Sequence, residues 1–232
     1  MIVAATKLKT HSCLLFSIVL LTLALSTTAF SQSEKKTAYG VLIDNSGSLR
    51  SQFPLVIGLA KGIVDRAHTR GPVSLFPFNS VSKNYKEGLI AVVGIDWSQD
   101  KALLDKYLDS IFVVPGQTTL SDGLAFVATH LDARIKADKE AYGEKIIFLI
   151  SDGEERVSHL TQEDLIKKLK AAGIKVYAIG LVQELDDVGG RPTKGKAVSF
   201  LERVTRETGG RAVIPKSKKF DVEAVLNELF VQ

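Results

Sequence analysis

Two aspartates follow apolar, strand-length runs of the sequence. Asp44 comes directly after Tyr39–Ile43, and Asp152 follows Lys145–Ile150 after a single serine. Ligands of parallel sheets bind beyond the carboxyl ends of the strands, so we expect both carboxylates at one edge of a sheet. Two buried like charges repel unless a cation lies between them or one carboxylate takes up a proton. The pattern therefore predicts a cation site or a proton-sharing pair.

Hydroxyl groups surround these carboxylates in the sequence. Ser46 and Ser48 follow Asp44 closely, and Thr118 lies in a connection that leads into a helical stretch. Hard oxygen ligands without histidine or cysteine suit Mg²⁺, Mn²⁺ or Ca²⁺ better than zinc. The aspartates also fit a simpler interpretation as turn residues, because Asp-x-Ser-Gly and Ser-Asp-Gly both favour tight turns. Glu154 and Glu155 are expected to be a solvated pair rather than ligands.

Strand-length apolar runs alternate with stretches of helical period. The expected strands are Tyr39–Ile43, Val73–Phe78, Lys145–Ile150, Ile174–Ile179 and Arg211–Ile214. Between them, apolar faces of helical spacing occur within 103–111, where Leu103 is one of the apolar residues, and within 124–135. Thr161 and Asp221 have the flanking residues of helix N-caps. This alternation predicts an α/β fold, a Rossmann-like doubly wound sheet of mostly parallel strands with helices on both faces.

Residues 1–31 have the features of a secretory signal peptide. Lys7 and Lys9 precede the apolar run Cys13–Leu25, and small residues follow it. We expect export to the periplasm or the exterior, with 32–232 as a single domain and no membrane span after cleavage. A retained N-terminal membrane anchor is the alternative. Cleavage would remove the only cysteine and leave a formal charge of +2.

The composition is that of a globular protein. Of the 232 residues, 45% are hydrophobic and 24% are charged, which excludes wholesale disorder and a coiled-coil rod. The formal net charge of +4 is too small an excess to indicate nucleic-acid binding.

Three motifs in order resemble the metal-ion-dependent adhesion site (MIDAS) of von Willebrand factor type A domains. These motifs are the stretch 44–48, Gly116-Gln117-Thr118 and Asp152-Gly153. The resemblance extends from about Tyr39 to the C-terminus, and the stretch 207–212 is similar to a group of exported bacterial proteins with this domain. It implies about six strands, one of them a short antiparallel edge strand. It also implies that the protein is not an enzyme.

The resemblance assigns roles to individual residues. Hydroxyl ligands, direct or through water, would come from Ser46, Ser48 and Thr118, while Asp44 and Asp152 would hold the waters of the metal. Thr118 directly follows Gly116-Gln117, and Thr119 remains an alternative. Mg²⁺ is the expected metal, with Mn²⁺ or Ca²⁺ possible. An Asp or Glu carboxylate of a protein partner would complete the octahedron, so the implied function is adhesion or protein interaction.

Two alternatives concern other parts of the chain. The stretch 190–196 has the spacing of a phosphate-binding loop, which would indicate an ATPase, but Ala197 stands where the Mg²⁺-binding hydroxyl belongs. The other alternative is an envelope scaffold that binds through helical faces without metal. The long connection Gln183–Lys196 is expected to lie beside the metal and to help select the partner.

Overall fold

The computed structural model describes residues 35–78, 93–116, 118–138, 140–185 and 193–231. The chain divides into Met1–Glu34 and Lys35–Gln232, and all of the described residues belong to the second unit. The expected signal peptide, 1–31, lies outside the described residues, so the boundary at residue 32 stays a prediction. None of the helices in the described ranges is long and apolar enough to cross a membrane.

A six-stranded sheet forms the centre of this unit, in the order β3-β2-β1-β4-β5-β6. The strands are β1 (Lys36–Asp44), β2 (Val73–Phe78), β3 (Ile95–Ser98), β4 (Tyr142–Ser151), β5 (Ile174–Gly180) and β6 (Ala212–Val213). Every pair is parallel except β2 with β3. The chain builds outward from β1 to β3, then returns to the other side of β1 to start β4. The strand order therefore reverses between β1 and β4, which is where open α/β sheets bind ligands.

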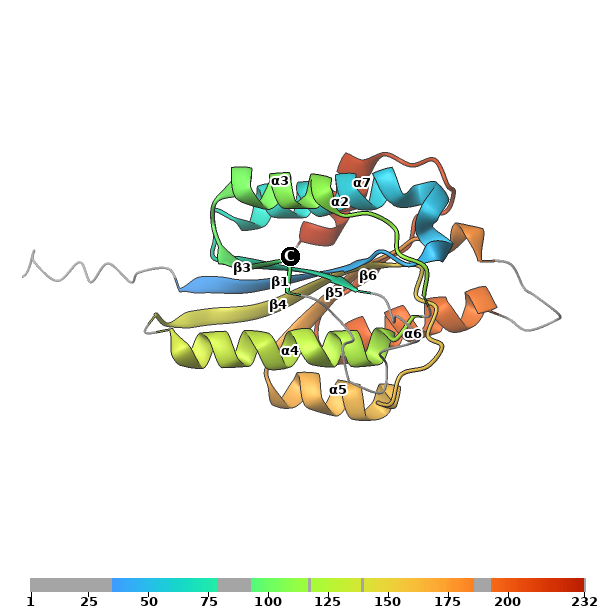
Figure 1. Cartoon of the computed structure of the whole chain (residues 1–232). Helices are drawn as coiled ribbons and strands as arrows, with labels where there is room; N and C mark the ends of the chain where they lie inside the picture. The colour runs from blue at the N-terminus through green and yellow to red at the C-terminus, as the bar shows by residue number, and fades with distance from the viewer. Residues whose placement is uncertain (1–34, 79–92, 117, 139, 186–192, 232) are drawn as a thin grey trace, which may run out of the picture. The chain divides into compact units, whose positions relative to one another are not determined.

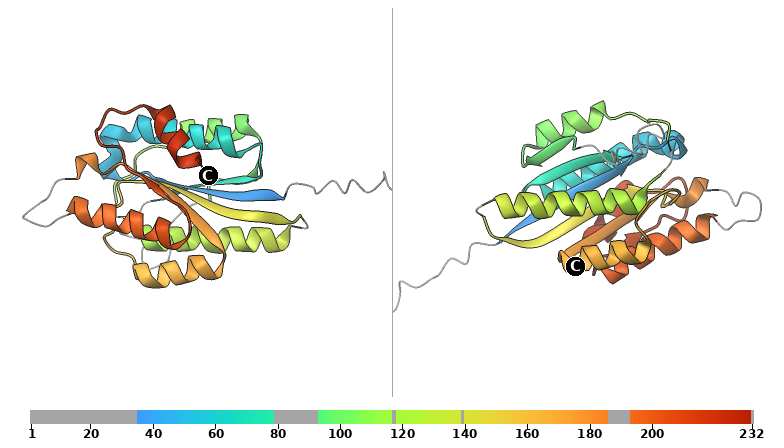
Figure 2. Two further views of the ribbon diagram at one scale, coloured as in Figure 1. Left: turned by 180° about the vertical axis from the view of Figure 1, so that it is seen from behind. Right: turned by 60° about the horizontal axis from the view of Figure 1, so that its bottom comes forward.

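Helices cover both faces of the sheet (Figures 1 and 2). One face carries α2 (Phe53–Ala67), α3 (Lys101–Ser110) and α7 (Val222–Phe230), and the other carries α4 (Leu120–Ala137), α5 (Gln162–Ala171) and α6 (Thr193–Glu207). Side chains of β1 alternate between the two cores: Val41 and Ile43 pack on the α2 side, and Leu42 packs on the α4 side. The predicted doubly wound α/β fold is confirmed.

The predicted helix N-caps agree with the structure better than the predicted apolar face within 103–111. Thr161 and Asp221 are N-caps, accepting hydrogen bonds from the backbone N–H groups of Asp164 and Glu223. On the apolar face expected within 103–111, Leu104 and Leu108 are buried, whereas Leu103 has an exposed fraction of 44%. Leu103 is therefore at the margin of this face. It occupies the first turn of α3, an outer helix that packs mainly on α2 and β3.

Helix α7 is held on α2 by one close approach and one arginine. A Cβ atom on Gly62 would lie 2.2 Å from Leu226 Cδ1, so the missing side chain makes room for this buried leucine. Arg66 donates hydrogen bonds to Glu223 at 2.7 Å and to Asn227 at 3.2 Å. The packing of α7 on α2 therefore depends on the absence of a side chain at Gly62.

The two glycines of α2 provide a test of this packing. Ala in place of Gly58 meets nothing within 4 Å, so Gly58→Ala should stabilise the domain by about 0.5–1 kcal/mol through helix propensity. Gly62→Ala gains the same propensity but overpacks Leu226, which costs about 1–3 kcal/mol. Urea denaturation of both variants measures the difference, and equal stabilisation would show that α7 does not pack as described.

Candidate metal centre

Two buried carboxylates lie where the strand order reverses. Asp44 ends β1 and is 0% exposed, and Asp152 directly follows β4 and is 2% exposed. Ser151 Oγ donates a hydrogen bond to Asp44 Oδ2 at 2.7 Å, and the backbone N–H of Ser46 donates to Asp44 Oδ1 at 3.0 Å. Asp44 is thus fixed by donors from both strand ends.

Hydroxyl groups lie beside the carboxylates. Ser46 Oγ and Ser48 Oγ are 3.0 Å apart, with Ser46 buried and Ser48 exposed. Thr118 and Thr119 are both buried, and Thr119 Oγ1 has no hydrogen-bond partner among the described residues. The structure therefore brings Ser46 and Ser48 together next to Asp44.

The carboxylates disfavour each other's charge. Burial, followed by the charge of Asp152, raises the pKa of Asp44 to about 7. Burial likewise raises the pKa of Asp152, and the nearby Ser48 hydroxyl and Glu154 N–H offset this only in part. These are the conditions under which a carboxylate pair takes up either a proton or a cation.

One carboxylate oxygen is left without a donor. Asp152 Oδ1 accepts a hydrogen bond from the Glu154 N–H at 2.9 Å, but Asp152 Oδ2 is buried and has no partner in the described part of the chain. Buried acceptors are normally paired, and binding of an ion at the site is one explanation of an exception. The oxygen donor set fits a hard divalent cation. The described residues contain no cluster of three or more His, Cys, Asp or Glu side chains, so hydroxyls are needed to complete a site here.

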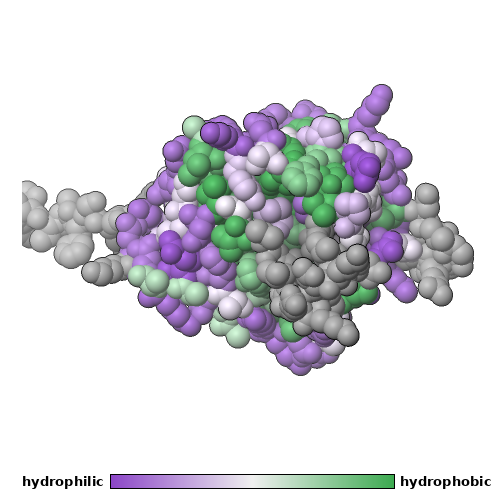
Figure 3. Space-filling view, viewed as in Figure 1, coloured by the Kyte–Doolittle hydropathy of each residue, from purple (hydrophilic) through white to green (hydrophobic). Residues whose placement is uncertain are grey.

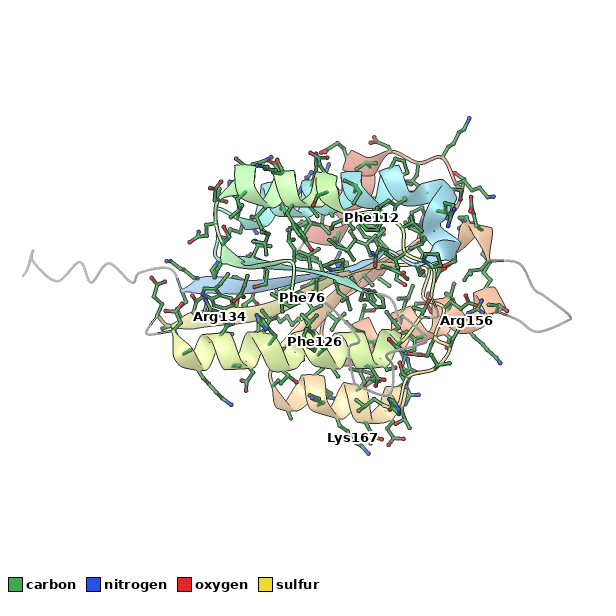
Figure 4. All side chains as sticks on the ribbon, viewed as in Figure 1. Phe76, Phe112, Phe126, Arg134, Arg156 and Lys167 are labelled. Carbon is green, nitrogen blue, oxygen red and sulfur yellow. The ribbon has the colours of Figure 1, made fainter. Side chains whose placement is uncertain are left out.

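Asn45 joins the connection after β1 to the segment between α3 and α4. Its Nδ2 donates to the Phe112 carbonyl at 3.0 Å, and its own carbonyl accepts from the Val114 N–H at 2.9 Å. Phe112 itself is 72% exposed beyond the end of α3, where Figure 3 shows apolar side chains and Figure 4 labels the residue. The segment that leads to Thr118 is therefore anchored next to Asp44.

Glu155 and Asp122 join the connection after β4 to the first turn of α4. Glu155 Oε2 accepts from the Ser121 N–H at 2.7 Å, and Asp122 accepts from the N–H groups of His159 and Leu160. The prediction of a solvated glutamate pair is wrong, since the Glu154 side chain is 14% exposed and Glu155 acts as an internal acceptor. Sequence reasoning missed Asn45, Asp122 and Ser151 as well. The sequence offered a signal for Asp122 alone, because acidic residues are favoured in the first turn of a helix.

A family model for the von Willebrand factor type A domain matches residues 40–217. This chain belongs to the von Willebrand factor type A family. A comparison with curated protein sequences finds no match. The predicted resemblance of the chain to this family is thereby confirmed over residues 40–217.

Solved structures share the fold of this VWA domain. Proximal thread matrix protein 1 from the mussel byssus is 18% identical with a TM-score of 0.63, covering 84% of this chain and 47% of that protein. One of its structures has a zinc-occupied MIDAS motif. The pilus adhesin SpaC of Lactobacillus rhamnosus GG is 18% identical with a TM-score of 0.60, covering 85% of this chain and 30% of SpaC. This chain thus spans less than half the length of both proteins.

A third solved structure has nearly the same extent as this chain. It is an aerotolerance-related membrane protein of Bacteroides fragilis, 17% identical with a TM-score of 0.60, covering 84% of this chain and 98% of that one. At such identities the likeness concerns the fold alone.

Gly153 is required by the VWA site for two reasons. Its φ of +76° is unfavourable for residues with a side chain, and a Cβ atom there would lie 2.9 Å from Leu201 Cδ1 and 3.1 Å from the Ala197 carbonyl. Its N–H donates to Ser151 Oγ at 3.0 Å, and Ser151 in turn donates to Asp44. The turn after Asp152 thus holds α6 against the site and orients Asp44.

The raised pKa of Asp44 predicts an unusual pH dependence for the metal-free domain. In the window from about pH 4 to 7, folded Asp44 keeps a proton that the unfolded chain has lost, because an aspartate in the unfolded chain has its ordinary pKa of 3.8. The contribution of Asp44 to stability is complete below pH 4 and falls as pH rises, by at most about 1.4 kcal/mol per pH unit.

Urea denaturation in EDTA between pH 4 and 8 measures this effect in the wild type and in Asp44→Asn. The difference between the two curves isolates Asp44 from other titrating groups. Asp44→Asn should be the more stable protein at pH 8, and a pH-independent difference would contradict the expectation.

Proposed function

We propose that this VWA domain binds a divalent cation and uses it to recognise a carboxylate of a protein partner. Mg²⁺ is the first choice, with Mn²⁺ or Ca²⁺ as alternatives, and the proposed site residues are Asp44, Ser46, Ser48, Thr118 and Asp152. The observation that carries the proposal is the buried Asp152 Oδ2, which has no donor among the described residues. A hydrated cation would satisfy this oxygen through one of its waters and would lower the repulsion from Asp44.

Each residue would have a definite role. The hydroxyls of Ser46, Ser48 and Thr118 would be ligands, and the two aspartates would accept hydrogen bonds from waters of the metal. A bound cation would supply an electrophilic centre with a position open to an outside carboxylate oxygen. With hydroxyls as the direct ligands, little negative charge would offset that of the cation. Binding would be the whole reaction, without a bond made or broken.

The comparisons support the coarser part of this proposal. VWA domains are generally interaction domains, one structural neighbour is a pilus adhesin and another binds zinc at its MIDAS motif. Thr118 is our choice of threonine because its carbonyl accepts from the Arg156 N–H at 3.1 Å, which ties it to the loop of Asp152. Thr119, with its buried unpaired hydroxyl, is the alternative ligand.

The phosphate-loop alternative has little support. Lys196 lies in the first turn of α6, but Ala197 after it is buried and carries no hydroxyl for Mg²⁺. Gly190 lies outside the described residues. Loss of nucleotide binding on Lys196→Ala would be needed to favour an ATPase. A metal-independent scaffold would instead keep its partner in EDTA.

We also infer export, on the strength of residues 1–31 and of the membrane protein among the structural neighbours. Production of the full chain in a bacterial host, followed by N-terminal sequencing of the envelope fraction, tests it. A mature protein that begins near Gln32 is expected. A chain that stays membrane-bound with its N-terminus intact would indicate the anchored alternative.

The serine pair allows a direct test of the metal site. Ser46→Ala combined with Ser48→Ala should weaken Mg²⁺ binding about tenfold or more in titration calorimetry, because two oxygen ligands are lost. Ser199→Ala, which removes an exposed hydroxyl from α6, is the matched control and should bind like the wild type.

Partner capture from native material completes this experiment. Capture should fail in EDTA, return when Mg²⁺ is added back, and fail again with the serine double variant. If the folded wild-type domain takes up neither Mg²⁺, Mn²⁺ nor Ca²⁺, the proposed function is wrong.

A further inference from the structure

Exposed basic side chains gather on the connections at the metal edge of the sheet. Arg50 lies in the short helix η1 (Gly47–Gln52), Lys196 in the first turn of α6, and Lys216 and Lys219 between β6 and α7. We call these four residues the basic rim. No ion pair joins any of them to an acidic residue within the described ranges.

Side-chain contacts join the connections that carry the basic rim to η1, which contains Ser48. Glu184, in the helix η3 (Val182–Glu184), accepts a hydrogen bond from Ser51 of η1 and pairs with Lys218 at 3.4 Å. Because η1 also contains Ser48, this glutamate joins the proposed site to the β6–α7 connection.

Gln183 makes the matching link to α6. Its Nε2 donates to the Pro215 carbonyl, and its Oε1 accepts from Lys194 Nζ at 3.0 Å. Figures 1 and 2 show η1, the start of α6 and the β6–α7 connection at the same end of the sheet. The three connections that carry the rim are therefore joined to one another at the metal edge.

Two glutamates in the described part of this edge already have basic partners. Glu154 pairs with Arg156 at 2.8 Å, next to α6 in Figure 4, and Glu184 is used as described. At the opposite edge two lysines have acidic partners, in the pairs Lys36–Glu140 and Lys175–Glu144. The described part of the metal edge therefore presents four exposed cations without an acidic partner.

We propose that the basic rim selects partners in which the metal-binding carboxylate lies within an acidic segment. This inference rests on the proposed function, since the metal would bind one carboxylate of the partner and the rim would attract the acidic residues beside it. Complementary charge raises association rates and disfavours uncharged or basic competitors. A protein segment is favoured over nucleic acid because the cations surround a carboxylate site from three connections instead of forming a stripe along a backbone path.

Titration of the ¹⁵N-labelled, Mg²⁺-loaded domain with two short peptides tests the inference by NMR, which detects weak binding. Both peptides have blocked ends and one central aspartate, flanked by glutamines in one and by glutamates in the other. The glutamate peptide should bind about three- to tenfold more tightly at low ionic strength. The preference should nearly vanish at about 0.5 M salt.

Two triple variants with equal loss of charge complete the design. K196Q/K216Q/K219Q should abolish the preference and leave the affinity for the glutamine peptide unchanged. K106Q/K168Q/R206Q, which neutralises exposed cations of α3, α5 and α6 that have no ion-pair partner among the described residues, should keep the preference.

The outcomes separate the inference from the proposed function. Mg²⁺-dependent binding of both peptides with equal affinity overturns the basic rim and leaves the metal site standing. Binding of neither peptide in Mg²⁺ overturns both. A single-stranded oligonucleotide that binds more tightly than the glutamate peptide in EDTA, and loses affinity in K196Q/K216Q/K219Q, would assign the rim to nucleic acid and overturn the inference.

Discussion

The repulsion between two buried carboxylates is the constraint around which this domain is arranged. Asp44 ends β1 and Asp152 directly follows the neighbouring β4 at the point where the strand order reverses, so the topology itself brings them together. Ser151 and the N–H groups of Ser46 and Glu154 satisfy part of their hydrogen-bonding capacity. The remaining charge is disfavoured by burial, as the raised pKa of Asp44 indicates. The site thus places disfavoured charge in an otherwise apolar centre, a common relation between function and stability.

Much of the fold could be predicted because its signals are local. Val73–Phe78 and Ile174–Ile179 read as strands from their apolar runs, and Thr161 and Asp221 cap helices through contacts a few residues away. Helix α2 and strand β3 were not assigned from the sequence. Strand β3 has four residues and only intermediate to exposed positions, so its pairing with β2 and not its composition makes it a strand.

The proposed site residues could be chosen from the sequence because their types and order form a motif. The residues that hold the connections of the site in place could not be chosen in this way. Asn45, Glu155 and Asp122 act through partners 34 to 69 positions away in the sequence, for which periodicity and spacing carry no signal. Exposure of Leu103 has the same origin, since a helical period does not say which helices form the outer layer. Local chemistry was readable, and tertiary context was not.

The connections around Asp44 are joined largely through main-chain atoms. Carbonyls of Asn45, Phe112 and Thr118 and the N–H groups of Val114 and Arg156 hold three separate segments together. Such bonds do not depend on which side chains the outward-facing positions carry. Residues at the mouth could therefore be randomised in a library while the geometry beneath them persists, which makes this edge a natural template for grafting new recognition specificities.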